Sequence, residues 1–257
     1  MDYKTILFEK RDSIGLLTLN RPETVNAMNQ TMIEEVESIL ESLQKDEAVR
    51  ILILTGSGEK GFCSGMDMKE SAAAFLEASP ELLYQAQKRA SHLFHQMRSI
   101  PQPVIAAVHG AAAGAGFSFA MASDIRIITP QAKFSAAYIN IGLGGADLAS
   151  SYFLPKLIGS GRANEFLLTG NYMTADEAMQ LGFASRKVDK EKLLDTAYEI
   201  ATTMAGKNPM GLIMTKEAIN QNLGVTSLEQ ALHLENRNQA FLATAMKVAH
   251  LIHQPKG

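Results

Sequence analysis

Several features that would point to a special environment are scarce in this sequence. It contains one cysteine, Cys63, among 257 residues, which excludes an internal disulfide framework and favours a reducing compartment. No uncharged apolar run approaches the roughly 20 residues of a membrane-spanning helix, and the charged N-terminus lacks the apolar segment of a signal peptide. The formal net charge of −3 offers no basic field for nucleic acid or an anionic membrane. We therefore expect a soluble, cytoplasmic protein with neither nucleic acid nor a membrane as partner.

The composition supports a well-packed globular chain. Hydrophobic residues make up 46% of the sequence, and its length suits one large domain or one domain with a smaller appendage. Apolar strand-like runs alternate with helical patterns, and from residue 190 onward the pattern is almost wholly helical. This order predicts an α/β core over residues 1–190 and a C-terminal helical region over residues 191–257.

The central stretch of the chain combines a buried strand with a loop of small residues. Val104–Val108 is an apolar run of strand length, His109–Gly116 consists almost entirely of glycine and alanine, and Phe117–Ser123 is an apolar helical segment ahead of the strand-like Asp124–Ile128. Small residues allow another group to approach the backbone closely. A helix that begins after such a loop presents free N–H groups, which favour an oxyanion. The alternative is close packing of helix on strand without a ligand.

A second stretch repeats this arrangement about fifty residues earlier. The apolar strand Arg50–Thr55 ends in the small-residue loop Gly56–Gly65, and Met66–Glu70 begins like a helix. Two loops of this kind could converge on one carbonyl oxygen, each contributing one N–H.

The remaining elements follow from periodicity and from turn and capping residues. We expect strands over residues 5–9 and 14–19, joined as a hairpin through Lys10–Ser13, and a further strand over residues 132–135. Helices are expected over residues 29–43, 71–99 with a break at Ser79–Pro80, 148–154, 162–168, 174–182 with a capping-box-like start at Thr174, 190–206, 209–222 and 226–249.

Motifs along nearly the whole chain resemble those of the crotonase family, also called the enoyl-CoA hydratase/isomerase family. The matching segments, in chain order, are Asn20-Arg21-Pro22, Asn26-Ala27-Met28, residues 60–70, residues 103–110, Gly114-Ala115-Gly116 with Asp124, residues 167–170, residues 175–178, Leu181-Gly182 and Asn208-Pro209. The resemblance implies a spiral of ββα units, a C-terminal helical trimerisation region, a homotrimer or hexamer, an acyl-CoA thioester as substrate and a role in fatty acid metabolism. It implies no cofactor, because coenzyme A is part of the substrate.

The resemblance also assigns roles to the two small-residue loops. Family members hold the thioester oxygen between two backbone N–H groups, which here correspond to Met66 after Gly65 and to Ala115 after Gly114. Two such donors stabilise the negative charge of a thioester enolate. Asp67 has two interpretations, a contact with the CoA moiety or a cap on the helix that it begins.

The sequence departs from the family's hydratases at two positions. Those enzymes carry two glutamates, and this chain has Ser118 and Tyr138 at the corresponding places. Neither residue replaces a carboxylate base at neutral pH. Ser118 and Tyr138 are therefore interpreted as substrate-binding positions, and Tyr138 either donates a hydrogen bond to substrate or only packs.

Asp147 is the nearest remaining carboxylate, just after the turn at residues 140–146. As a base it would lie among apolar side chains, where desolvation raises a carboxylate's pKa toward the working range. The alternative is that Asp147 only caps the following helix. The two roles are compatible.

Other reactive side chains are weaker candidates. His109 is expected to be a packed turn residue and Cys63 a buried one without an activating partner. His92 and His95 are three residues apart but lack a third ligand nearby, so no metal site is expected. Glu235 and Arg237 are expected to make helix or subunit contacts.

Together these features predict an acyl-CoA enzyme that polarises the thioester carbonyl and moves a proton with a single carboxylate, Asp147. One carboxylate suffices for double-bond isomerisation, which is therefore favoured over hydration. Two alternatives remain, a catalytically inactive acyl-CoA-binding protein and a CoA-thioester hydrolase.

Overall fold

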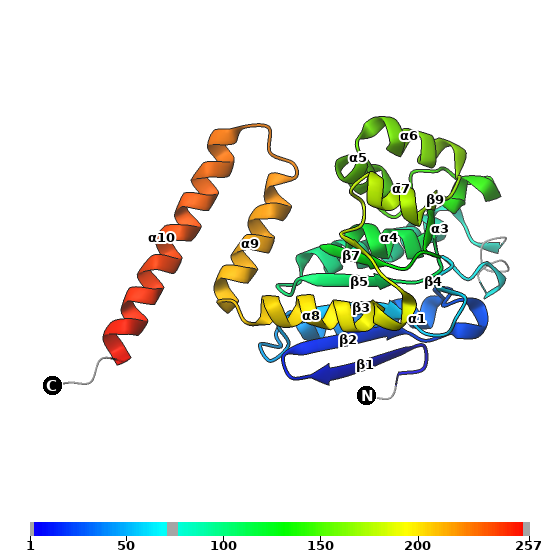
Figure 1. Ribbon diagram of the computed structural model, residues 1–257. Coiled ribbons are helices and arrows are strands. Elements are labelled where there is room, and N and C mark those ends of the chain that lie inside the picture. Colours follow the sequence, from blue (N-terminus) through cyan, green and yellow to red (C-terminus); the bar gives the residue numbers. More distant parts are fainter. Residues whose placement is uncertain (1–2, 71–76, 254–257) are drawn as a thin grey trace.

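The protein is built around a large sheet and a small sheet (Figure 1). The computed structural model describes residues 3–70 and 77–253, with side chains as far as residue 247. The six-stranded sheet has the order β1-β2-β3-β5-β7-β10, and the four-stranded sheet the order β4-β6-β8-β9. In the large sheet β1 and β2 form the predicted antiparallel hairpin, and the strands beyond β2 run parallel.

The described elements are bounded as follows. The strands are β1 (Ile6–Arg11), β2 (Ile14–Leu19), β3 (Ile51–Gly56), β4 (Gly61–Cys63), β5 (Val104–Val108), β6 (Ala111–Ala113), β7 (Ile125–Ile128), β8 (Lys133–Ser135), β9 (Met173–Thr174) and β10 (Arg186–Lys187). The helices are α1 (Gln30–Leu43), α3 (Pro80–Ser99), α4 (Ala115–Ala122), α5 (Ser150–Ile158), α6 (Ser160–Thr169), α7 (Ala175–Gln180), α8 (Leu193–Ala205), α9 (Pro209–Asn222) and α10 (Leu228–His253), with short 3-10 turns η1 (Pro22–Thr24), η2 (Ala137–Ile141) and η3 (Lys190–Lys192).

Strands of the two sheets alternate along the chain, which produces the ββα spiral. β3 of the large sheet is followed by β4 of the small one, β5 by β6, and β7 by β8. A helix follows β6 directly as α4, and the chain also turns helical at residues 68–70 soon after β4. The two segments predicted as loops, Gly56–Gly65 and His109–Gly116, are therefore only partly loops, because each contains a strand of the small sheet. β4 and β6 have only three residues each, and the alanines of β6 and the glycine of β4 have weak strand propensity, so the sequence pattern did not reveal these strands.

The central strands are covered on both faces, which explains their unbroken apolar sequences. In β3, Leu52 and Leu54 face the main core with α1, α3, α4 and the small sheet, whereas Ile51 and Ile53 face the other side. That second face is covered by α8. The predicted boundary between the α/β core and the C-terminal helical region, at residue 190, stays a prediction. α8, which follows that boundary, packs on the six-stranded sheet.

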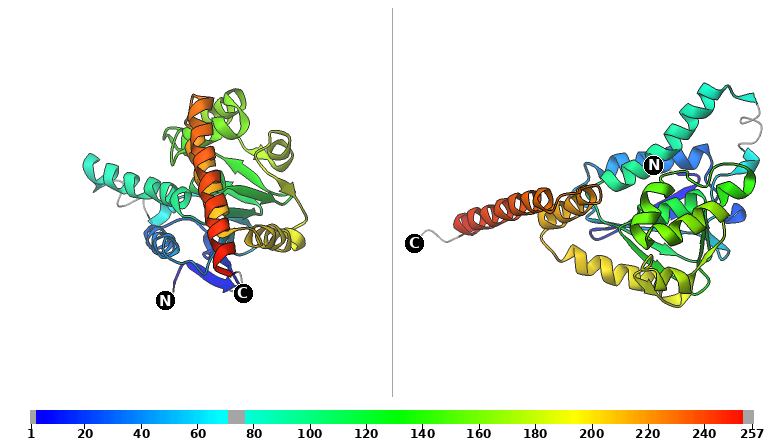
Figure 2. Two further views of the ribbon diagram at one scale, coloured as in Figure 1. Left: turned by 90° about the vertical axis from the view of Figure 1, so that its left-hand side faces the viewer. Right: turned by 90° about the horizontal axis from the view of Figure 1, so that it is seen from above.

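The last two helices lie apart from the sheets. Figures 1 and 2 show α10 extending beside α9, and Figure 2 shows the first part of α3 also reaching beyond the sheets. α9 is joined to the core by Lys216, which donates to the carbonyl of Gln102, and by Asn220, which donates to the carbonyl of Arg98. α3 begins after Ser79, whose side chain accepts a hydrogen bond from the N–H of Leu82, as the predicted break at Ser79–Pro80 requires. The predicted helix over residues 71–99 thus corresponds to α3 at its C-terminal end, while residues 71–76 lie outside the described residues.

Candidate active site

Pairing of β4 with β6 brings the two glycine turns into contact. The strands run parallel with Gly61 beside Ala111 and Cys63 beside Ala112, so the turns that follow them meet at the same edge. A Cβ added to Gly65 would lie 3.1 Å from the carbonyl oxygen of Ala113, and one added to Gly114 would lie 3.4 Å from the Cα of Gly65. Both glycines have positive φ, 107° and 52°. Backbone conformation therefore disfavours a side chain at both positions, and the close carbonyl of Ala113 also leaves little space for one at Gly65.

The backbone N–H of Met66 is directed away from Met28, with which Met66 forms an isolated parallel bridge. The N–H of Met28 donates to the carbonyl of Gly65 over 2.7 Å, and the N–H of Asp67 donates to the carbonyl of Met28 over 2.9 Å. In a parallel pairing the N–H and C=O groups of the intervening residue point to the opposite side. Met66 therefore presents its N–H on the side opposite to Met28.

Ala115 is the first residue of α4, so its N–H belongs to the donors that a helix leaves unpaired at its start. The first turn closes with the N–H of Ser118 donating to the carbonyl of Gly114 over 3.0 Å. Within the part of the chain that the structure describes, neither the N–H of Met66 nor that of Ala115 donates a hydrogen bond. Two donors without an internal acceptor thus follow two glycines that touch.

Ser118 and Tyr138, the two positions that lack the expected glutamates, are joined to each other. The Ser118 hydroxyl and the Tyr138 phenol are 3.1 Å apart, and the phenol donates to the carbonyl of Gly114 over 3.1 Å. Since the phenol proton is used on Gly114, Ser118 is the donor in the first bond. Burial raises the pKa of Tyr138, while the bond from Ser118 lowers it and the nearby charge of Asp147 raises it further. The phenol is therefore neutral at neutral pH and ties η2 to the Gly114 turn.

Asp147 lies on a strained turn before α5. The two residues after it, Leu148 and Ala149, have φ of 45° and 68°, a region that non-glycine residues enter at a cost of roughly 1–3 kcal/mol each. The carboxylate accepts from the N–H of Leu148 over 2.7 Å and from the side-chain amide of Gln87. Burial raises the pKa of Asp147, and these two hydrogen bonds lower it in part.

The capping interpretation of Asp147 is wrong. α5 begins at Ser150, its cap position is occupied by Ala149, and no side chain caps it. Two residues with left-handed backbone conformation, Leu148 and Ala149, separate Asp147 from the first residue of the helix. A capping residue would accept a hydrogen bond from the helix with its side chain. Asp147 instead donates its backbone N–H to the hydroxyl of Ser150, the first residue of α5, over 3.0 Å.

Asp67 is fully occupied by contacts within the chain. One carboxylate oxygen accepts from the N–H groups of Lys69 and Glu70, at 3.1 and 3.2 Å, and the other pairs with Arg21 at 2.8 Å. Burial alone would raise the pKa of Asp67, but the bond from Arg21 and the backbone donors bring it below its usual value. These contacts support the capping interpretation. They also engage Arg21, which bonds Glu70 and the carbonyl of Ala27 as well.

Of the remaining reactive side chains, Cys63 and His109 are buried, whereas His92 and His95 are exposed. Burial raises the pKa of the Cys63 thiol to about 12. Burial lowers the pKa of His109, and Lys190 adds to the effect. Among the described residues, no group of three histidine, cysteine or acidic side chains could hold a metal ion. His92 and His95 stack on each other, with ring centroids 5.5 Å apart.

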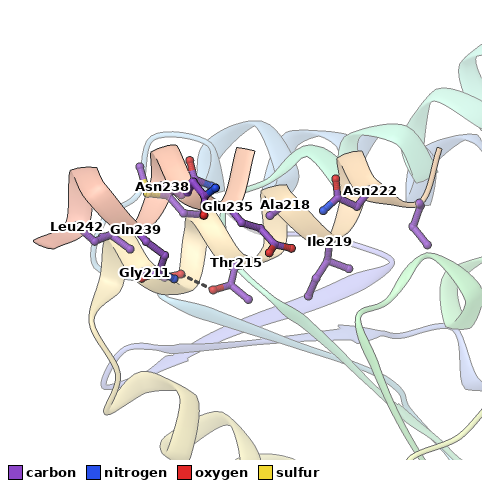
Figure 3. A pocket seen from close by; sticks show the side chains of 12 residues that line it. Gly211, Thr215, Ala218, Ile219, Asn222, Glu235, Asn238, Gln239 and Leu242 are labelled. Atoms are coloured by element: carbon purple, nitrogen blue, oxygen red, sulfur yellow. Dashed lines mark hydrogen bonds between the residues drawn. The ribbon is translucent and has the colours of Figure 1, made fainter. Parts of the chain in front are cut away.

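A separate groove lies between α9 and α10 (Figure 3). Its volume is about 580 Å³, and it is lined by both helices, including Thr215, Ile219, Glu235 and Leu242. Glu235 thus contributes to a surface between helices, as expected. The groove is remote in sequence from the glycine turns and holds none of the residues predicted for catalysis.

Sequence reasoning missed Gln87, which contacts Asp147 across 60 residues of chain. It lies on the exposed side of α3, and its residue type and spacing carry no signal of that partner.

The described helices include none that is both long and apolar enough to cross a membrane.

Comparison with known proteins identifies the family. The family model for enoyl-CoA hydratase/isomerase matches residues 9–250. A probable enoyl-CoA hydratase of Mycobacterium leprae is 38% identical over 236 residues, covering 91% of this chain and 80% of the relative. The 1,2-epoxyphenylacetyl-CoA isomerase of Escherichia coli is 35% identical, covering 91% and 88%. The crystal structure of a probable enoyl-CoA hydratase/isomerase from Mycobacterium abscessus superposes with a TM-score of 0.86 at 37% identity, covering 94% of this chain and 91% of that one. The crotonase spiral and the matched sequence together establish that this chain belongs to the enoyl-CoA hydratase/isomerase family of enzymes.

Proposed function

We propose that the protein binds an acyl-CoA thioester and moves a proton on its acyl chain, with double-bond isomerisation favoured over hydration. The observation that carries this proposal is the meeting of the Gly65 and Gly114 turns, each followed by an N–H that has no acceptor among the described residues. The thioester oxygen accepts from the N–H groups of Met66 and Ala115. In other enzymes, loss of one such donor costs roughly 2.7–4 kcal/mol of transition-state stabilisation.

The choice of isomerisation rests on the count of carboxylates. The positions of the two expected glutamates hold Ser118 and Tyr138, which bond to each other, and the phenol is kept neutral by burial. Asp147 remains as the base. It removes a proton from the carbon next to the thioester, the electron pair moves onto the oxygen held by the two amides, and the same carboxyl returns the proton to the γ carbon as the double bond shifts. No water is consumed, so a second carboxylate is not required.

The proposal for Asp147 has support from its surroundings. A base works best when its pKa lies near the operating pH, and burial raises the pKa of Asp147 toward that range. The left-handed backbone at Leu148 and Ala149 is the kind of strain that collects at functional sites.

The decisive experiment offers 3-enoyl-CoA and 2-enoyl-CoA thioesters of several chain lengths to the purified protein. Isomerisation converts the first into the second, hydration produces 3-hydroxyacyl-CoA, and hydrolysis releases free CoA. We expect the shifted alkene as the main product. Free CoA would indicate the hydrolase alternative, and binding of the thioesters without any product would indicate the inactive binding protein.

We also propose that the chain assembles as a homotrimer or hexamer through α9 and α10. Large apolar side chains are exposed along these helices, among them Ile219, Leu232, Phe241 and Met246, more than a monomeric surface normally leaves together. Light scattering behind size exclusion should return three or six times the chain mass of 27.9 kDa. A monomer at micromolar concentration would contradict the proposal.

A further inference from the structure

The carboxylate of Asp147 has an unusually small set of partners. Among the described residues it forms no ion pair, and the groups that donate to it are the N–H of Leu148 and the side-chain amide of Gln87. Leu148 is the next residue in the chain, so its N–H bond is local and does not fix the turn relative to the rest of the fold. Gln87 is therefore the contact that fixes the carboxylate relative to another part of the fold.

Gln87 is placed where α3 leaves the core. The buried residues of α3 are Ala90, Leu93, Phe94 and Met97, and Gln87 lies one helical turn before the first of them. The half of the helix before Ala90 is largely exposed, with Tyr84 66% exposed, and reaches beyond the sheets in Figure 2. The bond to Asp147 thus joins the exposed part of α3, one turn before its first buried residue, to the turn that precedes α5.

Resting on the role of Asp147 in the proposed function, we infer that Gln87 is a positioning residue: its amide N–H holds the Asp147 carboxylate in the ionised form that accepts the proton. The Gln87 side chain is neutral, so it stabilises the anion by a charge-assisted hydrogen bond without neutralising it. A cation in this place would make the carboxylate a weaker base.

Few other charges act on this carboxylate. From η2, the phenol of Tyr138 interacts electrostatically with Asp147 but stays neutral. On α3, Arg89 is engaged by Glu34 and Glu37 of α1, and Lys88 forms no described ion pair. The charge placed at position 87 should therefore be the main electrostatic influence on the protonation of the Asp147 carboxylate.

The test is a charge series at position 87, read as kcat and KM against pH with 3-hexenoyl-CoA from about pH 5 to pH 9. The rise of kcat/KM on the acidic side reports protonation of the base. We expect it to move to lower pH in Gln87→Lys, to higher pH in Gln87→Leu, and furthest to higher pH in Gln87→Glu. On the acidic side Gln87→Leu should lose roughly 3- to 10-fold in kcat/KM, as expected for a partly exposed bond to a charged group, while KM at high pH stays unchanged.

The matched control is Gln85→Leu, which removes the same side chain two residues away on the same exposed part of α3. It should leave the pH profile unchanged. Profiles that do not follow the order of charge, or an equal effect of Gln85→Leu, would overturn the role of Gln87. The proposed function fails separately, if Asp147→Asn retains full turnover.

Discussion

The two halves of the candidate site are held by different kinds of interaction. The turns at Gly65 and Gly114 are held by strand pairing and by main-chain hydrogen bonds, and Ala115 is fully buried. Asp147 is half-buried on a strained turn, and its carboxylate is held by one side chain of another element, Gln87 of α3. The first half is set by backbone register, which tolerates many side chains. The second half depends on single side chains, so a single substitution there can change the basicity of the Asp147 carboxylate.

The largest expected effect is on the Asp147 half. Asp147→Asn removes the base without changing the side-chain shape, so kcat should fall by about 10²- to 10⁴-fold while affinity for a CoA ester is retained. Turnover with 3-hexenoyl-CoA and calorimetric titration with an unreactive acyl-CoA measure the two properties. A variant with unchanged kcat would remove Asp147 from the mechanism.

A backbone change should break the other half. Gly65→Val places a branched side chain where φ is 107° and where a Cβ already lies 3.1 Å from a carbonyl oxygen, so the Met66 N–H is displaced. The loss of one donor predicts a decrease of about 10²- to 10³-fold in kcat.

Gly161→Val is the control for Gly65→Val, since a Cβ there meets nothing within 4 Å. Circular dichroism and thermal melting separate misfolding from a local effect. Near-normal kcat in a folded Gly65→Val protein would contradict the role of this turn.

The link between the halves can be tested at Tyr138. Tyr138→Phe keeps the buried ring but removes the bonds to Ser118 and to the Gly114 carbonyl. If the phenol only ties η2 to the turn, kcat should fall by about 3- to 10-fold, in line with one or two neutral hydrogen bonds. Steady-state kinetics measures this, and a loss far beyond that range would indicate direct contact with substrate.

The smallest expected effect is on stability. Burial raises the folded-state pKa of Asp147, so the ionised carboxylate opposes folding at any pH above that pKa, and the penalty disappears once pH falls below the ordinary aspartate value. Asp147→Asn lacks this penalty and should melt slightly higher at neutral pH, by up to about 2 °C for this partly solvated group. The difference should vanish in acid. Calorimetric melting at both pH values would reveal a wrong sign directly.

Much of the fold could be predicted from local pattern. The hairpin at Lys10–Ser13, the helix that starts after Asn29 and the capping box at Thr174 were all confirmed, because each depends on neighbouring residues. The strands β4 and β6 were missed because each has only three residues and is defined by pairing with a distant segment of the chain. The capping alternative for Asp147 was wrong because the next two residues, Leu148 and Ala149, adopt a left-handed conformation that their residue types normally avoid.

The amino-acid sequence by itself determined the α/β alternation, the two small-residue turns, the absence of glutamates at positions 118 and 138, and the family. Periodicity, glycine content and residue identity are local properties that need no coordinates. Only the tertiary structure decided that Gly65 lies against Gly114, that Ser118 bonds Tyr138, and that Gln87 reaches Asp147. Those contacts join residues 20 to 60 positions apart, and packing of the whole chain selects them.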